Sequence, residues 1–141
     1  MGLPVSKGLI AELDFRMPGT RVWLKVLIFD TRKSMRRFTR RGFCFGTPPT
    51  GCPAFCTPLE SECSRGEMVD PRYFAVVFLT ARALRQDVIT HEAVHAAFAF
   101  RRRRPRFRWM DSDNEEEGIC YPAGIIARMI HEASMIRNGL R

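Results

Sequence analysis

The segment His91-Glu92-Ala93-Val94-His95 constrains this chain most, because its two histidines lie four residues apart. On an α-helix this spacing places both imidazoles one turn apart on the same face, where they can reach a single Zn²⁺ ion. Glu92 is then rotated away from the two ligands, toward the position of a water molecule that it can deprotonate. The segment therefore predicts a helix that carries a zinc site and a general base.

The residues around this segment also support a helix. Apolar residues and the two histidines recur at positions i, i+4, i+7, i+11 and i+14, which places them on one stripe. The members of this stripe are Leu84, Val88, His91, His95 and Phe98. Asp87 or Thr80 is a candidate N-cap residue. The competing interpretation is that both histidines pack in the core as members of the stripe.

A catalytic zinc site needs a third protein ligand and an open fourth position. The pattern that adds a glycine and a third histidine to the segment is excluded, because Phe98 and Arg101 occupy those positions. The acidic segment 113–117 offers a glutamate on a following helix instead. Glu117 follows His95 by 22 residues, which is enough for the first helix to end, turn and return antiparallel.

Two glutamates compete for the ligand position. Asp113 is a good N-cap residue, which makes Glu116 the N3 member of a capping pair and gives it a structural role. We therefore predict Glu117 as the third ligand, with Glu116 as the alternative. Tyr121 lies one turn after Glu117 and can donate a hydrogen bond to a ligand or to a developing oxyanion.

With these residues the chain resembles the gluzincin metallopeptidases, the thermolysin-like group, in a minimal form, over residues 73–137. It is also similar to short, uncharacterised proteins of bacteriophages and prophages. The resemblance implies a zinc-dependent peptidase that acts on peptides or proteins. The implied fold is α+β and zincin-like, with a small mixed sheet, an active-site helix and a C-terminal helix that carries the third ligand. The implied ligands of one catalytic zinc ion are His91, His95 and Glu117, with Glu92 as the base; the chain departs from the family at Tyr121, where an acidic partner is usual.

Two apolar runs predict strands, because residues 22–29 and 73–79 are rich in β-branched and aromatic side chains. Residues 43–45 predict a short third strand, and the prolines and glycines of residues 46–71 predict a long irregular loop. In zincin-like folds the strand before the active-site helix commonly forms a sheet edge, to which an extended peptide can add. The alternative for residues 73–79 is a buried core strand.

Four cysteines in or beside the predicted loop form a candidate site for a second, structural zinc ion. They are Cys44, Cys52, Cys56 and Cys63. Their spacing contains no C-x2-C pair, so free and partly buried thiols are the alternative.

The net charge of +8 is concentrated in arginine runs. One run interleaves guanidinium groups with aromatic rings, which suits phosphate contact and base stacking. Its arginines are Arg101, Arg102, Arg103, Arg104, Arg106 and Arg108. They predict binding of nucleic acid or of an acidic partner, and a solvated surface is the competing interpretation. The alternative function is accordingly a basic nucleic-acid-binding or phage accessory protein whose zinc site is structural or vestigial.

The length of 141 residues predicts one domain over residues 1–141 that buries a core without disulfides. No apolar run is long enough to cross a bilayer, and the first ten residues lack the pattern of a signal peptide. We expect a soluble protein of the cytoplasm, or of the host cytoplasm if a phage encodes it. His131 is expected to be exposed on the last helix, with a hydrogen bond to the reacting groups as the alternative.

Overall fold

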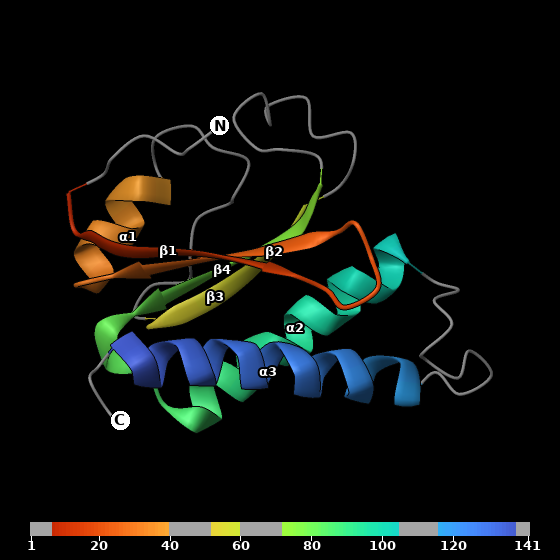
Figure 1. The fold of residues 1–141 in the computed structure, drawn as a ribbon. Helices are drawn as coiled ribbons and strands as arrows, with labels where there is room; N and C mark the ends of the chain where they lie inside the picture. Colours follow the sequence, from red (N-terminus) through yellow and green to blue (C-terminus); the bar gives the residue numbers. More distant parts are fainter. Residues whose placement is uncertain (1–6, 40–51, 60–71, 105–115, 138–141) are drawn as a thin grey trace.

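The computed structural model describes residues 7–39, 52–59, 72–104 and 116–137. These residues form a mixed four-stranded sheet that carries helices on both faces (Figure 1). The predicted α+β fold class, with a small mixed sheet, is thereby confirmed. No helix within these ranges is long and apolar enough to span a membrane.

The strands are arranged in the order β1-β2-β4-β3. β1 (Leu9–Arg16) and β2 (Trp23–Phe29) are antiparallel, and β2 runs parallel to β4 (Tyr73–Thr80). β3 (Ala54–Pro58) pairs antiparallel with β4 and forms the edge on that side. The two predicted apolar strands are confirmed as β2 and β4.

The helices cover the two faces of the sheet unequally. α1 (Arg32–Thr39) lies on one face, while α2 (Gln86–Arg103) and α3 (Glu117–Arg137) lie on the other (Figure 1). β4 leads through the short 3-10 helix η1 (Ala81–Ala83) directly into α2. The helix that carries the two histidines is therefore anchored to an interior strand.

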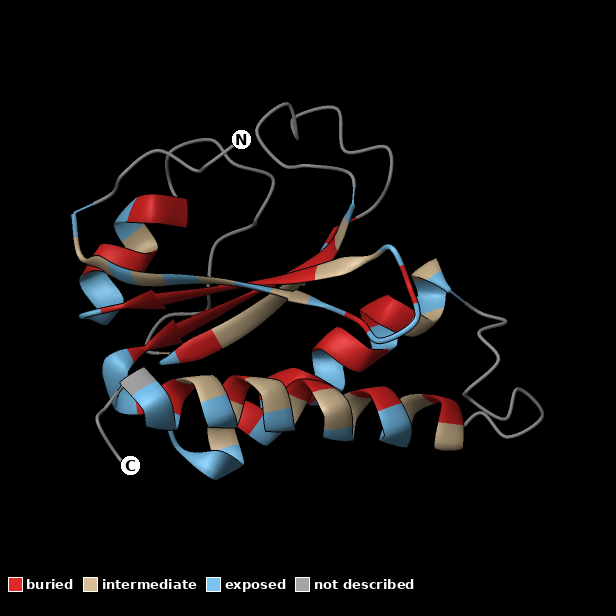
Figure 2. Ribbon diagram, viewed as in Figure 1, coloured by how far each residue is buried: buried red, intermediate tan, exposed pale blue. Residues whose placement is uncertain are grey.

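The central strands are buried on both faces, which explains their continuous apolar sequence. Leu24, Val26 and Ile28 of β2 belong to the core cluster of α2 and α3, whereas Leu27 and Phe29 belong to the cluster of α1. Figure 2 shows this buried interior between the sheet and the helices. Small buried side chains let α2 approach its neighbours closely; these are Ala93, Ala96, Ala97 and Ala99.

The edge of the sheet differs from the expectation. β4 is an interior strand between β2 and β3, so the edge expected there is formed by β3 instead. β3 itself lies within residues 46–71, for which the sequence predicts an irregular loop throughout. It is fixed by the Phe55 ring, which stacks on Phe78 with 4.3 Å between the ring centroids. The predicted strand 43–45 lies outside the described residues.

α1 is an element that the sequence does not predict, because half of its residues are basic and suggest a charged surface run. Two apolar residues, Met35 and Phe38, are fully buried and pack against Phe29 of β2 in the cluster of α1. At its first turn the Ser34 N–H donates to the Thr31 hydroxyl at 3.2 Å. The two apolar residues and this bond are enough to fold a short helix onto the sheet.

Candidate metal centre

α2 carries His91 and His95 on its exposed side, one turn apart. Their Nε2 atoms lie 3.2 Å apart, and the planes of the two rings are inclined by 72°. Two ligands of a tetrahedral zinc ion, each about 2.0–2.1 Å from the metal, stand about 3.3–3.4 Å from each other. The two imidazoles therefore converge at the separation that a pair of zinc ligands requires.

Only the first part of the predicted stripe faces the core, where Leu84 and Val88 pack as partly buried residues. His91 and His95 are exposed, and half of the surface of Phe98 is exposed (50%). The core side of the helix is instead formed by small and apolar residues such as Ile89 and Phe100. The histidines are thus not packed core residues in this fold.

The start of α2 also differs from the expectation. Its N-cap residue is Arg85, and no side chain makes a cap hydrogen bond there. Asp87 pairs with the Arg85 guanidinium at 2.6 Å, and the Thr80 hydroxyl donates to the backbone oxygen of Pro53 at 3.0 Å. Neither predicted residue therefore caps the helix.

Glu92 is turned toward the interior and is only 4% exposed. Its Oε2 atom has no hydrogen-bond partner among the residues that the structure describes. Burial raises the pKa of Glu92, and the neighbouring His91 partly opposes this shift. A buried carboxylate oxygen without a partner is unfavourable for folding. Such an oxygen beside two converging imidazoles fits the donor set of a zinc ion with its hydrolytic base.

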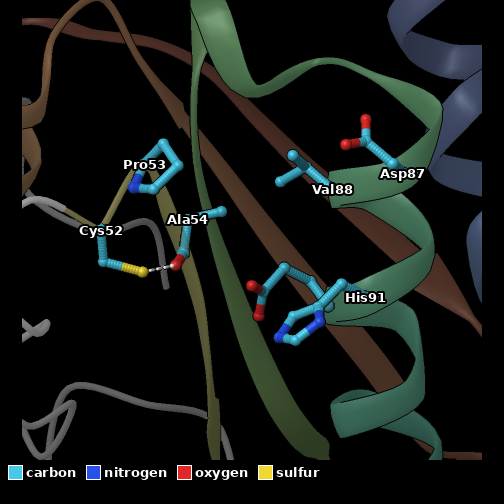
Figure 3. Close-up of a pocket in the computed structure, with 7 residues that line it drawn as sticks. Cys52, Pro53, Ala54, Asp87, Val88 and His91 are labelled. Atoms are coloured by element: carbon cyan, nitrogen blue, oxygen red, sulfur yellow. Dashed lines mark hydrogen bonds between the residues drawn. The ribbon is translucent and has the colours of Figure 1, made fainter.

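An open cavity of about 280 Å³ separates the first turns of α2 from the beginning of β3. In Figure 3, Val88 and His91 of α2 face Cys52 and Ala54 across this cavity. Glu92 also lines it. A molecule in the cavity can therefore reach both an imidazole and the candidate base.

β3 is the edge strand at this cavity, and no other strand of the described residues pairs with its outer side, here called the free edge. Pro53 O and Leu59 N are bonded to β4, at 3.1 Å and 2.9 Å. Because the backbone groups of a strand alternate between its two sides, those of Ala54 and Cys56 are directed to the free edge. The Cys52 thiol donates to the backbone oxygen of Ala54 there. The outward backbone groups of Ala54 and Cys56 thus lie on the strand that lines the cavity opposite His91, with the Ala54 oxygen bonded to the Cys52 thiol.

The proposed four-cysteine site is not assembled among the described residues. Cys52 lines the cavity and Cys56 packs against the core cluster of α2; both are free thiols. Burial raises the pKa of the Cys56 thiol to about 12, and the nearby Glu92 carboxylate adds to the shift. Cys56 therefore packs as a protonated, apolar group. Cys44 and Cys63 lie outside the described residues, so a second zinc ion stays a prediction.

The third zinc ligand is not brought to the histidines in the described part of the chain. α3 begins at Glu117, and Gly118 lies against the side chain of Arg101. Arg101 is six residues beyond His95, which is about 9 Å farther along α2. In the ranges that the structure describes, no three histidine, cysteine, aspartate or glutamate side chains form a metal-binding group. Glu117 as the third ligand stays a prediction.

Glu116 does not occupy the N3 position that its predicted capping role requires. It precedes α3, and its backbone oxygen accepts the Cys120 N–H at 2.9 Å, as an N-cap residue does. Asp113, the predicted N-cap residue, lies outside the described residues. The prediction that Glu116 is the N3 residue of α3 is therefore wrong.

Tyr121 and His131 both belong to α3. Tyr121 is 54% exposed, whereas His131 is half-buried rather than exposed as expected. The Nδ1 atom of His131 is buried and has no hydrogen-bond partner in the described ranges. Within those ranges, neither side chain is hydrogen-bonded to His91 or His95. Their proposed contribution to the chemistry stays a prediction.

The arginine run is divided between structure and surface. Arg103 is half-buried and its guanidinium donates to Leu59 O at 3.1 Å and Tyr73 O at 3.0 Å, which ties β3 and β4 to the end of α2. Arg101 is half-buried against α3. The other members are Arg102 and Arg104, which are exposed, and Arg106 and Arg108, which lie outside the described residues. At least one arginine of the predicted nucleic-acid contact thus holds the fold together.

The backbone of Ala54 and Cys56 is a site element that sequence reasoning misses. Prolines and cysteines around this segment suggest a loop, and its five residues are too few for a clear periodicity. The signal that was present is the alternation of Phe55 and Thr57, two residue types that favour strands.

Comparison with known proteins adds no family to this description. No protein-family model matches the chain, and no curated protein or solved structure matches it. The interpretation of the site therefore depends on the geometry of α2 and β3.

Proposed function

We propose that the chain is a zinc-dependent metallopeptidase of the gluzincin kind, with a zincin-like arrangement of sheet and active-site helix. The observation that carries the proposal is the 3.2 Å approach of His91 and His95 beside the buried Oε2 atom of Glu92, which has no hydrogen-bond partner among the described residues. A stabilising role alone does not account for this arrangement, because exposed imidazoles add little packing and an unpaired buried carboxylate is unfavourable. Metal binding and base catalysis account for both.

In the proposed reaction, His91 and His95 would hold the zinc ion, and Glu117 is the proposed third ligand, which the described residues do not bring to the two histidines. When bound, zinc supplies a Lewis acid that polarises a carbonyl group and lowers the pKa of water. Glu92 takes a proton from the attacking water and passes it to the departing amine. Burial raises the pKa of Glu92, which makes its carboxylate a stronger base than an exposed one. Tyr121 is the proposed hydrogen-bond donor to the developing oxyanion.

The free edge of β3 supports a peptide as the substrate. An extended peptide can pair with the outward backbone groups of Ala54 and Cys56 and become a fifth strand. Such pairing lays the peptide along the cavity that His91 and Glu92 line. Backbone pairing makes recognition largely independent of the peptide's side chains, except where a pocket receives one of them.

Metal analysis of the purified chain tests this proposal most directly. We expect about one zinc ion per chain, which is lost when His91 and His95 are both replaced by Ala. His131→Ala is the matched control, because it removes a histidine from the other helix and should retain zinc. Equal zinc content in the double variant and the wild type, or no zinc in either, would contradict the proposal.

The alternative function is a basic nucleic-acid-binding or phage accessory protein. The observation that favours it is the exposure of Arg102 and Arg104 at the end of α2. Binding of this kind weakens steeply as salt rises, because phosphate contacts release counterions. A peptidase activity that is independent of these two arginines separates the alternatives.

A further inference from the structure

A second cavity, of about 500 Å³, lies where β2 and β4 end. These two strands are parallel, so their C-terminal ends lie together, beside the beginning of β3 and the start of α1 (Figure 1). Crevices at the C-terminal ends of parallel strands are common ligand sites. The lining residues are Asp30, Thr31, Arg32, Pro53, Thr80 and Arg82.

The charge of this cavity favours an anion. Two arginines, Arg32 and Arg82, line it together with one acidic residue, Asp30. Hydrogen bonds from Ser34 and Thr31 lower the pKa of Asp30. The Asp30 carboxylate therefore already has hydrogen-bond partners within the protein. Arg82 is exposed and makes no hydrogen bond or ion pair with another residue in the described ranges. Its five N–H donors remain available to a ligand.

The second cavity adjoins the first one. Pro53 lines both, so it forms the wall between them. Two bonds from Thr80, through its N–H at 3.1 Å and its hydroxyl at 3.0 Å, hold the backbone oxygen of Pro53 in place. A peptide paired with the free edge at Ala54 continues past Pro53. Side chains on one face of such a peptide recur about every 6.6–6.8 Å, so one of them falls near this wall within two or three residues of the histidines.

We propose that the cavity lined by Arg82 is a specificity subsite that binds a carboxylate of the peptide substrate. This inference rests on the proposed function, since it names the class of peptide that the site takes. The carboxylate comes from an Asp or Glu side chain or from the C-terminus of the peptide. Arg82 is the specificity-determining residue, because a guanidinium binds a carboxylate through two parallel hydrogen bonds.

Binding of fluorescent peptides to the full chain with Glu92→Gln tests the subsite without cleavage. One amidated series carries a single Glu that moves along a neutral background, a second series carries Gln at the same positions, and a third carries Gln and a free C-terminal carboxylate. We expect one Glu position, or the free C-terminus, to tighten binding about three- to tenfold over its neutral match. The preference should shrink as NaCl rises from about 50 to about 500 mM.

Arg82→Gln should abolish this preference while leaving the affinity for the neutral series unchanged. The matched control is Arg21→Gln, which removes an exposed arginine just before β2, at the opposite end of the sheet. Equal affinity for charged and neutral peptides, no binding of any series, or an equal loss in both variants would overturn the subsite.

Peptide hydrolysis by the wild-type chain tests the peptidase proposal separately. If the chain hydrolyses peptides but shows no preference that depends on Arg82, the subsite proposal is wrong and the peptidase proposal is retained. An Arg82-dependent binding preference without hydrolysis of any peptide retains the carboxylate pocket and removes the peptidase.

Discussion

Two polar clusters of this protein differ in whether their buried charged group has hydrogen-bond partners. The cleft cluster consists of His91, Glu92 and His95 on α2, and its buried carboxylate oxygen has no hydrogen-bond partner in the described ranges. The Lys25 cluster consists of Lys25, Glu12, Asp14 and Tyr73. Since Lys25 alternates with Leu24 and Val26 along β2, it lies on the other face of the sheet.

In the Lys25 cluster the buried charge is well paired. The ammonium group of Lys25 donates to Glu12 and, at 2.9 Å, to Asp14 on the neighbouring strand. The Tyr73 hydroxyl donates to the same Asp14 at 2.8 Å, and the ammonium lies 4.8 Å from the centre of the Tyr73 ring. This network joins three strands of the sheet through polar contacts.

The difference indicates what each cluster is for. Networks in which each charge is paired contribute to a specific fold, whereas an unpaired buried carboxylate opposes folding. Such a group beside two exposed histidines lowers the free energy of unfolding of the protein. We infer that the Lys25 cluster serves the fold and that the cleft cluster serves a reaction, and the following variants test this division.

The largest expected effect is on hydrolysis. Glu92→Gln should lower kcat at least about 100-fold on any peptide that the wild type cleaves, because Gln keeps the shape but accepts no proton. Zinc content should be unchanged, and the midpoint of thermal unfolding should be equal or higher, since a poorly paired carboxylate is removed. The control is Glu132→Gln, which alters an exposed glutamate of α3 paired with Arg128. Full activity of the Glu92 variant would show that this residue is not the base.

The second effect concerns zinc affinity. Glu117→Ala should weaken zinc binding at least about tenfold, because a carboxylate ligand is lost. Glu115→Ala should change it little. The measurement is competition with a chelator of known affinity. If zinc loss follows Glu116→Ala instead, Glu116 is the ligand and the gluzincin hypothesis survives.

The third effect concerns stability. Lys25→Met should lower the free energy of unfolding by about 1–2 kcal/mol, because Glu12 and Asp14 lose their shared partner while remaining partly exposed. Zinc binding and hydrolysis should be unchanged. Urea unfolding of the variant and the wild type measures the first quantity. A loss of zinc in this variant would break the separation between the two clusters.

The fourth effect is the pH dependence of that contribution. Burial lowers the pKa of Lys25, but the hydrogen bonds and the charge attraction of Glu12 and Asp14 together outweigh burial and leave the pKa above the ordinary value of 10.5. The stabilisation is therefore fully present below pH 10.5 and is lost as the pH rises through the raised value. Unfolding curves from pH 9 to about 12 should show the wild type and Lys25→Met converging in stability. A constant difference between them over this range contradicts the assignment.

The smallest effect on hydrolysis is expected from the arginine run. Replacing Arg102 and Arg104 by Gln should leave zinc binding and hydrolysis unchanged and reduce the affinity for DNA and RNA, together with its salt dependence. The matched control replaces Arg16 and Arg21, two exposed arginines at the turn between β1 and β2. If both double variants bind nucleic acid as the wild type does, the run is a solvated surface.

Several parts of the fold follow from the sequence because they depend on local patterns. The strands β2 and β4 are continuous apolar runs, and α2 combines alanine, a strong helix former, with the spacing of two histidines. The convergence of His91 and His95 also follows, since four residues on a helix always make one turn. Glu92 is likewise assigned to a side of the helix by that periodicity.

Other parts depend on contacts between distant segments, which local patterns do not encode. β3 is a strand because Phe55 stacks on Phe78, and α1 is a helix because two side chains are buried beside Phe29. The sequence predicts that Arg103 contacts nucleic acid or belongs to a solvated surface, yet two backbone oxygens from separate segments accept hydrogen bonds from its guanidinium. The sequence separates these partners by tens of residues.

The sequence by itself determined the chemistry available to this protein: two imidazoles and a carboxylate on adjoining faces of one helix, at a spacing set by the helical repeat. Only the tertiary structure decided that β3 is an edge strand of the described sheet, that Glu92 is buried while the histidines are exposed, and that Pro53 lines two cavities. The physical reason is that burial and edge position are properties of the packed chain. They are fixed by which surfaces the sheet and helices cover, and not by the residues of any single segment.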